Sequence, residues 1–399
     1  MQPQPDGERW DVFCRVVDNY GDVGVSWRLA RQLAREHGKG VRLWLDDLTV
    51  LAKLRPEIDA ARDMQLLEGV EVARLREPMA APDVADVVVE TFGCDPPEAY
   101  VRAMAARAAK PRWINLEYLS AEEWVEASHA LPSPNPRLPL VKHYFFPGFT
   151  ARTGGLLRER SLINRRDEFQ ADPGAQAAFW SSLVGKAPPQ NALKVSLFAY
   201  AGAPLESLAR ACRQYPGPVW LIAFEGVAAS ALRSLVSPRH ETIRRNTHQG
   251  GSRRELEVFA VPFLAQDRYD QLLWASDVNF VRGEDSFVRA QWAGRPFVWN
   301  VYPTDDGAHW VKMAAFLARY TEALDRPRAA AVTSLWEAWN RRGDEGSSGK
   351  APPSLADAWA AFIGRRAALD GHAKAWSAAL AARRELAAEL VDFAGNVLK

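Results

Sequence analysis

The segment 282–289 (RGEDSFVR) combines residue types that could bind a phosphorylated ligand. It follows an apolar run, residues 278–281, that predicts a short buried strand, and it precedes a helical pattern. A helix start offers backbone N–H groups to phosphate, and the guanidinium of Arg282 offers paired donors. Glu284 and Asp285 would repel a bare phosphate, so the turn predicts a ligand that is both phosphorylated and hydroxylated, such as a nucleotide sugar. The same acidic residues could instead only cap the helix.

A second transition from strand to helix carries two aspartates near the start of the chain. Residues 10–17 predict a strand, and a helical pattern follows the loop that contains Asp18 and Asp22. The two carboxylates would lie at the sheet edge where open α/β folds bind their ligands. The loop lacks a G-x-G-x-x-G fingerprint, so a dinucleotide site is not indicated. Each aspartate could also be only a turn or capping residue.

Strands and helices alternate through both halves of the chain. Strands are expected at residues 41–45, 85–90, 112–116, 193–198, 218–223, 255–261 and 296–300. This alternation predicts an α/β fold built from parallel βαβ units. A linker at 185–191 separates halves of similar size, so we expect two Rossmann-like domains facing each other across a cleft. Residues 117–155 show no regular period and predict loops that shape a surface.

The overall composition excludes several classes of protein. The 399 residues carry a formal net charge of +1, so no nucleic acid or membrane surface is expected as a partner. The three cysteines are widely spaced and lack metal-ligand spacing, which favours a reducing compartment. The polar N-terminus has no signal-peptide core, and no apolar run is long enough to cross a bilayer. We therefore expect a cytoplasmic protein.

Two long segments carry a resemblance to a known family. Residues 10–33 (WDVFCRVVDNYGDVGVSWRLARQL) and 280–302 (FVRGEDSFVRAQWAGRPFVWNVY) resemble the bacterial protein-arginine rhamnosyltransferases that modify elongation factor P (EF-P). Shorter similar stretches lie at 116–120, 132–134, 146–149 and 154–155. The pairing of D-N-Y-G-D-x-G near the start with R-G-E-D-S late in the chain is distinctive.

The resemblance implies a fold and a reaction. The expected architecture is the GT-B glycosyltransferase fold, with the active site between two Rossmann-like domains. The expected reaction is an inverting transfer of L-rhamnose from dTDP-β-L-rhamnose to one arginine in a loop of EF-P, without cofactor or metal. This modification would activate EF-P for rescue of polyproline-stalled ribosomes. The resemblance also implies domain roles: residues 1–185 face the acceptor protein, residues 191–365 bind the donor, and the helical tail 366–399 packs back on the N-terminal domain.

The resemblance also transfers site residues to matching positions. The catalytic set is Asp18, Asp22 and Glu284. From the chemistry of a cationic guanidinium acceptor, rather than from the resemblance, we expect Asp22 to be the base-like residue and Asp18 to orient the acceptor. The donor-binding set comprises Phe198, Tyr200, Gln266, Tyr269, Arg282, Gly283, Asp285, Ser286 and Tyr302. Phe198 and Tyr200 match aromatic positions around the base, and Tyr269 stands where another aromatic ring is expected.

Two other interpretations stay open from the residues. A nucleotide-sugar transferase with a small-molecule or glycan acceptor would need a narrow N-terminal pocket. A nucleotide-binding module without catalysis would be expected to lack a catalytic carboxylate, and none is missing. A group of acidic residues favours a cationic acceptor; its members are Asp18, Asp22, Glu117, Glu122 and Glu123. For Glu122 and Glu123, a solvated helix face is an equally good explanation.

Overall fold

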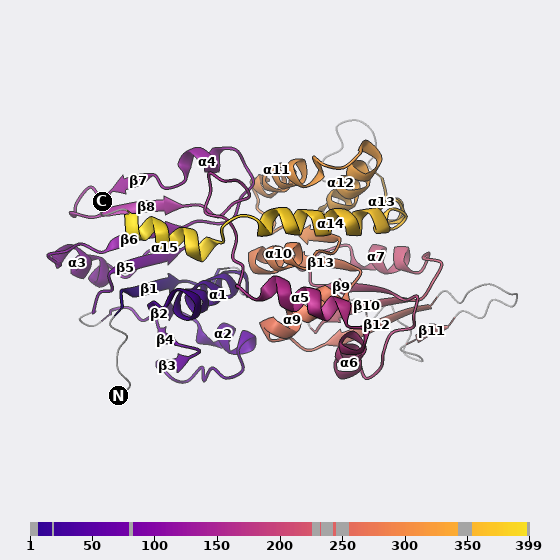
Figure 1. Cartoon of the computed structure of the whole chain (residues 1–399), viewed down its shortest axis with the longest axis horizontal. Helices are drawn as coiled ribbons and strands as arrows, with labels where there is room; N and C mark the ends of the chain where they lie inside the picture. Colours follow the sequence, from indigo (N-terminus) through magenta and orange to yellow (C-terminus); the bar gives the residue numbers. More distant parts are fainter. Residues whose placement is uncertain are drawn as a thin grey trace, which may run out of the picture. The chain divides into compact units, whose positions relative to one another are not determined.

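A computed structural model describes residues 7–17, 20–79, 83–225, 232, 242–244, 255–341 and 353–396 (Figure 1). The chain divides into two units, each with its own sheet. Unit 1 comprises Met1–Arg160 and Leu380–Lys399, and unit 2 comprises Ser161–Ala379. Each unit is an α/β layer structure, which confirms the predicted fold class.

Unit 1 is built on an eight-stranded sheet of order β3-β4-β2-β1-β5-β6-β8-β7. The strands are β1 (Arg9–Cys14), β2 (Gly40–Leu45), β3 (Met64–Leu67), β4 (Val70–Arg74), β5 (Val87–Thr91), β6 (Arg112–Leu116), β7 (Pro132–Pro134) and β8 (Val141–Phe145). Only β3 and β7, at the two edges, pair antiparallel with their neighbours. Parallel strands covered on both faces need continuous apolar runs, and β1 and β5 are buried along nearly their whole length.

Helices pack against the sheet of unit 1. They are α1 (Tyr20–His37), α2 (Leu48–Leu54), α3 (Glu98–Ala106), α4 (Trp124–Ser128) and α15 (Leu386–Asn396). Helix α15 comes from the end of the chain and packs against α1 (Figure 1). The Phe393 ring lies 5.4 Å from that of Phe145, and the Leu386 N–H donates to the Leu156 carbonyl over 3.0 Å. The C-terminal helix is therefore part of the N-terminal unit.

Unit 2 is built on a six-stranded sheet of order β11-β12-β10-β9-β13-β14. The strands are β9 (Leu193–Leu197), β10 (Val219–Phe224), β11 (Thr242–Arg244), β12 (Glu255–Val261), β13 (Val278–Arg282) and β14 (Phe297–Asn300). All pair in parallel except β11 with β12. The carboxyl ends of β9, β13 and β14 therefore meet at one edge, where ligands bind in folds of this kind.

The helices of unit 2 surround this sheet. They are α5 (Leu162–Ala171), α6 (Pro173–Val184), α7 (Leu205–Cys212), α9 (Gln266–Ala275), α10 (Gly283–Trp292), α11 (Ala308–Thr321), α12 (Arg326–Asn340), α13 (Leu355–Ile363) and α14 (Arg366–Ala381). Aromatic rings fill the space between α10, α11, α12 and β14. Phe287 stacks on Trp299 at 4.1 Å between ring centroids, and Phe316 stacks on Trp336 at 5.5 Å. This packing holds the start of α10 against the sheet.

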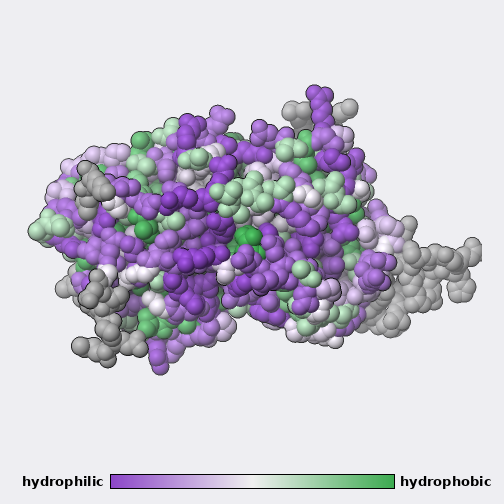
Figure 2. Space-filling model, viewed as in Figure 1, coloured by the Kyte–Doolittle hydropathy of each residue, from purple (hydrophilic) through white to green (hydrophobic). Residues whose placement is uncertain are grey.

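The surface is mainly hydrophilic on the face drawn in Figure 2. Apolar side chains instead fill the layers between sheets and helices, as burial of apolar area requires. Within the ranges that the structure describes, no helix is both long and apolar enough to span a bilayer.

Candidate functional site

The segment that follows β13 changes directly from strand to helix. The sequence predicts a polar turn here, but β13 continues through Arg282 and α10 begins at Gly283. Gly283 has a φ of 66°, a left-handed conformation that glycine adopts without the penalty of a β-carbon. Glu284 and Asp285 therefore lie in the first helical turn, where the helix dipole favours negative charge.

Arg282 is held between two aromatic rings. Its guanidinium carbon lies 4.5 Å from the centroid of Phe198 and 4.6 Å from that of Tyr200. Both rings follow the end of β9, where the Phe198 N–H donates to the Phe280 carbonyl over 2.9 Å. Contact with two rings restricts where the guanidinium can lie and leaves its N–H groups able to donate hydrogen bonds. This is a suitable arrangement for a ligand that carries phosphate oxygens.

Further aromatic side chains gather around this cation. The Tyr302 ring lies edge-on to Tyr200 at 5.3 Å, and its side chain is 51% exposed. Tyr269 lies 6.2 Å from Phe198 and 5.6 Å from Phe224 between ring centroids. Burial raises the pKa of the Tyr269 hydroxyl above its usual range, so this group stays protonated. The predicted aromatic set therefore lies together at the carboxyl edge of the unit 2 sheet.

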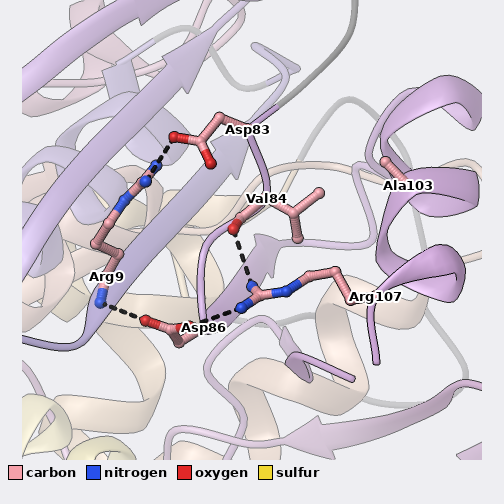
Figure 3. A pocket seen from close by; sticks show the side chains of 6 residues that line it. All are labelled: Arg9, Asp83, Val84, Asp86, Ala103 and Arg107. Atoms are coloured by element: carbon pink, nitrogen blue, oxygen red, sulfur yellow. Dashed lines mark hydrogen bonds and ion pairs between the residues drawn. The ribbon is translucent and has the colours of Figure 1, made fainter. Parts of the chain in front are cut away.

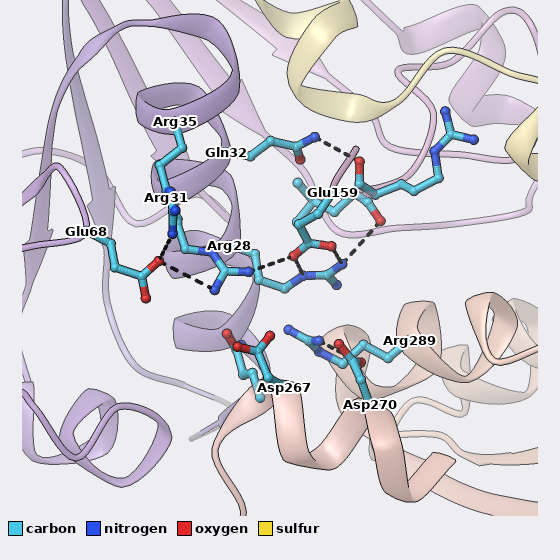
Figure 4. Close-up of polar contacts among 12 residues, drawn as sticks. Arg28, Arg31, Gln32, Arg35, Glu68, Glu159, Asp267, Asp270 and Arg289 are labelled. Atoms are coloured by element: carbon cyan, nitrogen blue, oxygen red, sulfur yellow. Dashed lines mark hydrogen bonds and ion pairs between the residues drawn. The ribbon is translucent and has the colours of Figure 1, made fainter. Parts of the chain in front are cut away.

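Asp285 is engaged in a buried network of charges. Its carboxylate accepts hydrogen bonds from Gln266 Nε2 at 3.2 Å and from Arg289 Nε at 2.8 Å. Arg289 also donates to Asp270 over 2.8 Å (Figure 4). Gln266 and Asp270 belong to α9, and Asp285 and Arg289 belong to α10, so these hydrogen bonds hold the two helices together. Ser286, also buried, lies in the same first turn of α10.

Asp22 occupies a corresponding place in unit 1. Helix α1 begins at Tyr20, so Asp22 lies in its first turn, and its side chain is almost completely buried. One carboxylate oxygen accepts from the Val17 N–H at 3.0 Å, and the other accepts from the Tyr118 hydroxyl at 3.4 Å. These donors orient both oxygens of the carboxylate. Asp18, the other predicted catalytic aspartate, lies outside the described residues.

A charged network holds the helix that carries Asp22. Arg28, on α1, donates through Nε and Nη2 to the two oxygens of Glu159 at 2.9 and 2.7 Å (Figure 4). Arg31 donates to the same carboxylate over 3.2 Å, and Gln32 donates to the Arg158 carbonyl over 2.8 Å. Two parallel bonds between a guanidinium and a carboxylate set orientation as well as distance. Helix α1 is thereby fixed to the segment 157–159.

Two further residues near Asp22 are absent from the predicted site residues, although one of them, Tyr118, falls within the similar stretch 116–120. The Tyr118 ring stacks on Phe92, with 4.3 Å between centroids and 15° between planes. Phe92 follows β5 and Tyr118 follows β6, so both come from the same sheet edge as Asp22. No local pattern signals them, because the two residues are far apart in the chain and only the strand order brings them together.

The cysteines are unsuited to nucleophilic chemistry. Burial raises the pKa of Cys14 and of Cys212 to about 12, and it raises the pKa of Cys94 further. All three thiols therefore stay protonated near neutral pH. Among the residues that the structure describes, no three His, Cys, Asp or Glu side chains form a group that could hold a metal ion.

A separate cavity of about 330 Å³ opens in unit 1, lined by charged residues (Figure 3). It lies at the amino ends of β1 and β5, whereas Asp22 lies at their carboxyl ends. Its charges are paired: Arg9 with Asp83 at 2.5 Å, and Arg107 with Asp86 at 3.1 Å. The cavity therefore lies at the opposite sheet edge from the candidate site.

Comparison with known proteins decides between the open interpretations. The family model "Elongation-Factor P (EF-P) rhamnosyltransferase EarP" matches residues 10–395. The protein-arginine rhamnosyltransferase of Pseudomonas putida is 46% identical over 391 residues, which cover 98% of this chain and 99% of that relative. The Pseudomonas aeruginosa protein of the same name is 43% identical over 387 residues, covering 96% and 98%.

This chain belongs to the EarP family. The match confirms the resemblance that residues 10–33 and 280–302 carry. A solved structure that describes EarP-mediated arginine glycosylation of translation elongation factor EF-P is 34% identical, with a TM-score of 0.64 and coverage of 98% and 99%. A glycosyltransferase from Rickettsia africae is only 10% identical, yet it has a TM-score of 0.54 and coverage of 99% for both chains, which bears on the fold alone. The fold is GT-B, as predicted.

Proposed function

We propose that this member of the EarP family moves L-rhamnose from dTDP-β-L-rhamnose to a guanidino nitrogen of a loop arginine in EF-P. The observation that carries this function is the family match over residues 10–395, which includes both candidate sites. EF-P is accordingly the acceptor partner, and the modification prepares it to rescue ribosomes stalled on polyproline. Since EF-P acts in translation, the enzyme works in the cytoplasm.

The donor is assigned to unit 2. Arg282 and the backbone N–H groups at the start of α10 would bind the diphosphate and stabilise the charge that develops on it as it leaves. Phe198, Tyr200, Tyr269 and Tyr302 would surround the thymine. The contact of Arg282 with the Phe198 and Tyr200 rings supports this assignment, because a cation for the diphosphate and aromatic rings for the base would then be adjacent.

The remaining residues of the α10 turn receive different roles. Glu284, which is partly exposed, would accept hydrogen bonds from sugar hydroxyls, and Ser286 and the Gly283 backbone would complete the donor pocket. Asp285 is a positioning residue, because its bonds to Gln266 and Arg289 fix the first turn of α10.

The acceptor arginine is assigned to unit 1. In the transfer, an N–C bond forms at the anomeric carbon, the C–O bond to the diphosphate breaks, and dTDP leaves with the bonding electron pair. A guanidinium has a pKa above about 12, so a carboxylate does not deprotonate it beforehand. Asp22 would instead bind the guanidinium, localise its π-electrons, and accept the proton as the new bond forms. Asp18 would hold the guanidinium in place.

Intact-protein mass spectrometry tests the function. EF-P incubated with this protein and dTDP-β-L-rhamnose should gain one deoxyhexose, and replacement of its loop arginine by lysine should abolish the gain. No gain, with dTDP still binding, would support the alternative of a nucleotide-sugar transferase with a small-molecule or glycan acceptor.

The same assay tests whether the reaction needs a metal. Arg282 and the amides of α10 already supply positive charge to the diphosphate, so the gain in mass should persist after treatment with EDTA. A loss that Mg²⁺ restores would contradict a metal-free transfer.

A further inference from the structure

Phe92 has a backbone conformation that aromatic residues rarely adopt. Its φ is 58°, in the left-handed region, at the point where β5 ends. A non-glycine residue persists there only where its surroundings hold it, and such residues cluster at functional sites. The Phe92 N–H donates to the Leu116 carbonyl over 2.7 Å. The next N–H, that of Gly93, donates to Asn115 Oδ1 over 3.1 Å, so the end of β6 holds this turn.

This conformation places the Phe92 ring on Tyr118. The two rings are nearly parallel, with 15° between planes and 4.3 Å between centroids. Tyr118 is 36% exposed, whereas Asp22, which accepts from its hydroxyl, is only 1% exposed. An accessible aromatic side chain therefore adjoins a buried carboxylate. Two stacked rings that only filled a core would not need this exposure or this polar neighbour.

Such a pair of groups suits a planar cation. A guanidinium presents flat faces to an aromatic ring while its N–H donors, which lie in the plane, reach a carboxylate. The ammonium of lysine is a compact point charge, so it does not combine stacking with paired in-plane donation. The same unit already shows the stacked part of this geometry, since the guanidinium carbon of Arg42 lies 4.7 Å from the centroid of the Trp44 ring.

We propose that Tyr118, supported by Phe92, is the platform on which the acceptor guanidinium lies while Asp22 binds its N–H donors. The ring of Tyr118 contacts the substrate and selects arginine over lysine. Its hydroxyl positions Asp22, and Phe92 acts through Tyr118 as a positioning residue. This inference rests on the proposed function, since it requires an arginine as the acceptor.

Two substitutions separate the ring from the hydroxyl. Tyr118→Leu removes the stacking surface, and Tyr118→Phe keeps that surface but removes the hydrogen bond to Asp22. Trp44→Leu is the matched control, because Trp44 also belongs to a stacked pair in this sheet, with Phe13 at 5.9 Å, and lies outside the site. Each variant is tested as the full chain with EF-P and with EF-P whose loop arginine is replaced by lysine.

Calorimetry and steady-state kinetics give the decisive values. Wild type should bind arginine-bearing EF-P more tightly than the lysine form. Tyr118→Leu should raise the Kd and KM for EF-P by about 3- to 30-fold, the range of a cation–π contact, and should remove the preference for arginine. Tyr118→Phe should keep that preference and lower kcat by about 2- to 10-fold, the loss of one hydrogen bond. Trp44→Leu should leave the Kd and KM for EF-P and the preference for arginine near their wild-type values. All variants should bind dTDP with an affinity near that of wild type.

The possible outcomes distinguish failure of this inference from failure of the proposed function. Wild type that transfers no deoxyhexose would refute the proposed function. Wild type that transfers it, with Tyr118→Leu retaining both its KM for EF-P and its preference for arginine, would refute only the platform. Loss of the arginine preference in Tyr118→Phe to the same extent as in Tyr118→Leu would also refute it, because the ring would then not be the selective group.

Discussion

At the scale of single residues, Asp22 is a buried carboxylate whose two oxygens are both oriented. The Val17 N–H and the Tyr118 hydroxyl donate to opposite oxygens, and the start of α1 adds the positive end of a helix dipole. Both oxygens are thereby held in place as acceptors. A partner with several N–H donors in one plane, such as an acceptor guanidinium, suits this arrangement better than a single hydroxyl.

Substitution of Asp22 should therefore lower the turnover rate and leave binding of the donor nucleotide unchanged. Asp22→Asn keeps the shape of the side chain but removes its charge and its ability to take a proton. We expect kcat to fall by about 10²- to 10⁴-fold, the range for loss of a general base, while dTDP affinity stays near wild type. Rates come from the mass assay with EF-P, and affinity comes from calorimetry.

A neighbouring aspartate provides the control. Asp46 also accepts a backbone hydrogen bond from this loop, from the Val16 N–H at 3.0 Å, but it is exposed. Asp46→Asn should change kcat little. A parallel loss of dTDP affinity in Asp22→Asn would contradict the role that we assign to Asp22.

Arg282 is the corresponding residue for the donor. Arg282→Ala removes the cation that Phe198 and Tyr200 hold in place, so charge-assisted hydrogen bonds to the diphosphate are lost. We expect the Kd for dTDP to rise about 10- to 100-fold in calorimetry. Arg268→Ala is the control, since that guanidinium also lies over a ring, 4.7 Å from Phe179, but outside the site. An unchanged dTDP affinity in Arg282→Ala would exclude Arg282 from diphosphate binding.

At the scale of elements, α10 joins the donor site to the interior of unit 2. Asp285 lies in its first turn, and Arg289, one turn later, bridges Asp285 to Asp270 on α9. The Arg289 side chain is only 1% exposed, so removing it leaves two carboxylates buried without their cation. Loss of one partner from a buried ion pair is far more destabilising than loss of an exposed pair.

A comparison of two helical ion pairs measures this effect. Arg289 pairs with Asp285 at 2.8 Å with a spacing of four residues, and Arg210 on α7 pairs with Glu206 at the same distance and spacing but on the surface. Arg289→Met should destabilise the protein by about 3–5 kcal/mol, which lowers Tm by roughly 6–20 °C. Arg210→Met should cost less than about 1 kcal/mol and shift Tm by at most a few degrees. Equal shifts in the two variants would refute a bracing role for Arg289.

The same elements show what the sequence could predict. Apolar runs at 193–198 and 296–300 predicted β9 and β14, because a parallel strand covered on both faces needs continuous apolar residues. Residues 141–145 (VKHYF) lack such a run, so the sequence predicted a loop, and that prediction was wrong. They form β8, which pairs in parallel with β6. Pairing with an existing strand, rather than local pattern, determines this element.

In the candidate site, too, some parts could be predicted from local sequence and others could not. The start of α10 could be predicted from the segment 282–289, because a strand, a glycine and acidic residues follow one another along the chain. The partnership of Tyr118 with Asp22 spans 96 residues and depends on the order β1-β5-β6, which no local pattern contains. The left-handed φ of Phe92 could not be predicted from the sequence either, since aromatic residues seldom adopt it.

At the scale of the whole molecule, each unit presents its candidate residues at the carboxyl edge of its own sheet. In unit 2 aromatic rings surround the cation Arg282, with Glu284 and Asp285 in the adjoining first turn of α10, and in unit 1 the aromatic rings of Phe92 and Tyr118 adjoin the carboxylate of Asp22. Opposite charge requirements are expected when one unit binds an anionic nucleotide sugar and the other binds a cationic side chain. We therefore propose that unit 2 is the donor domain and unit 1 the acceptor domain.

Hydrogen exchange of the full chain tests this division. dTDP should slow exchange most strongly in unit 2, at the start of α10 and in the segments that follow β9 and β14, because its ligands lie there. EF-P alone should slow exchange in unit 1, at the start of α1 and in the segment after β6. Arg282→Ala provides the control, since at the same dTDP concentration it should lose most of the protection in unit 2. Protection by dTDP that is greater around Asp22 and Tyr118 than around Arg282 would reverse the assignment, because a ligand that binds only the folded state stabilises most directly the groups that it contacts.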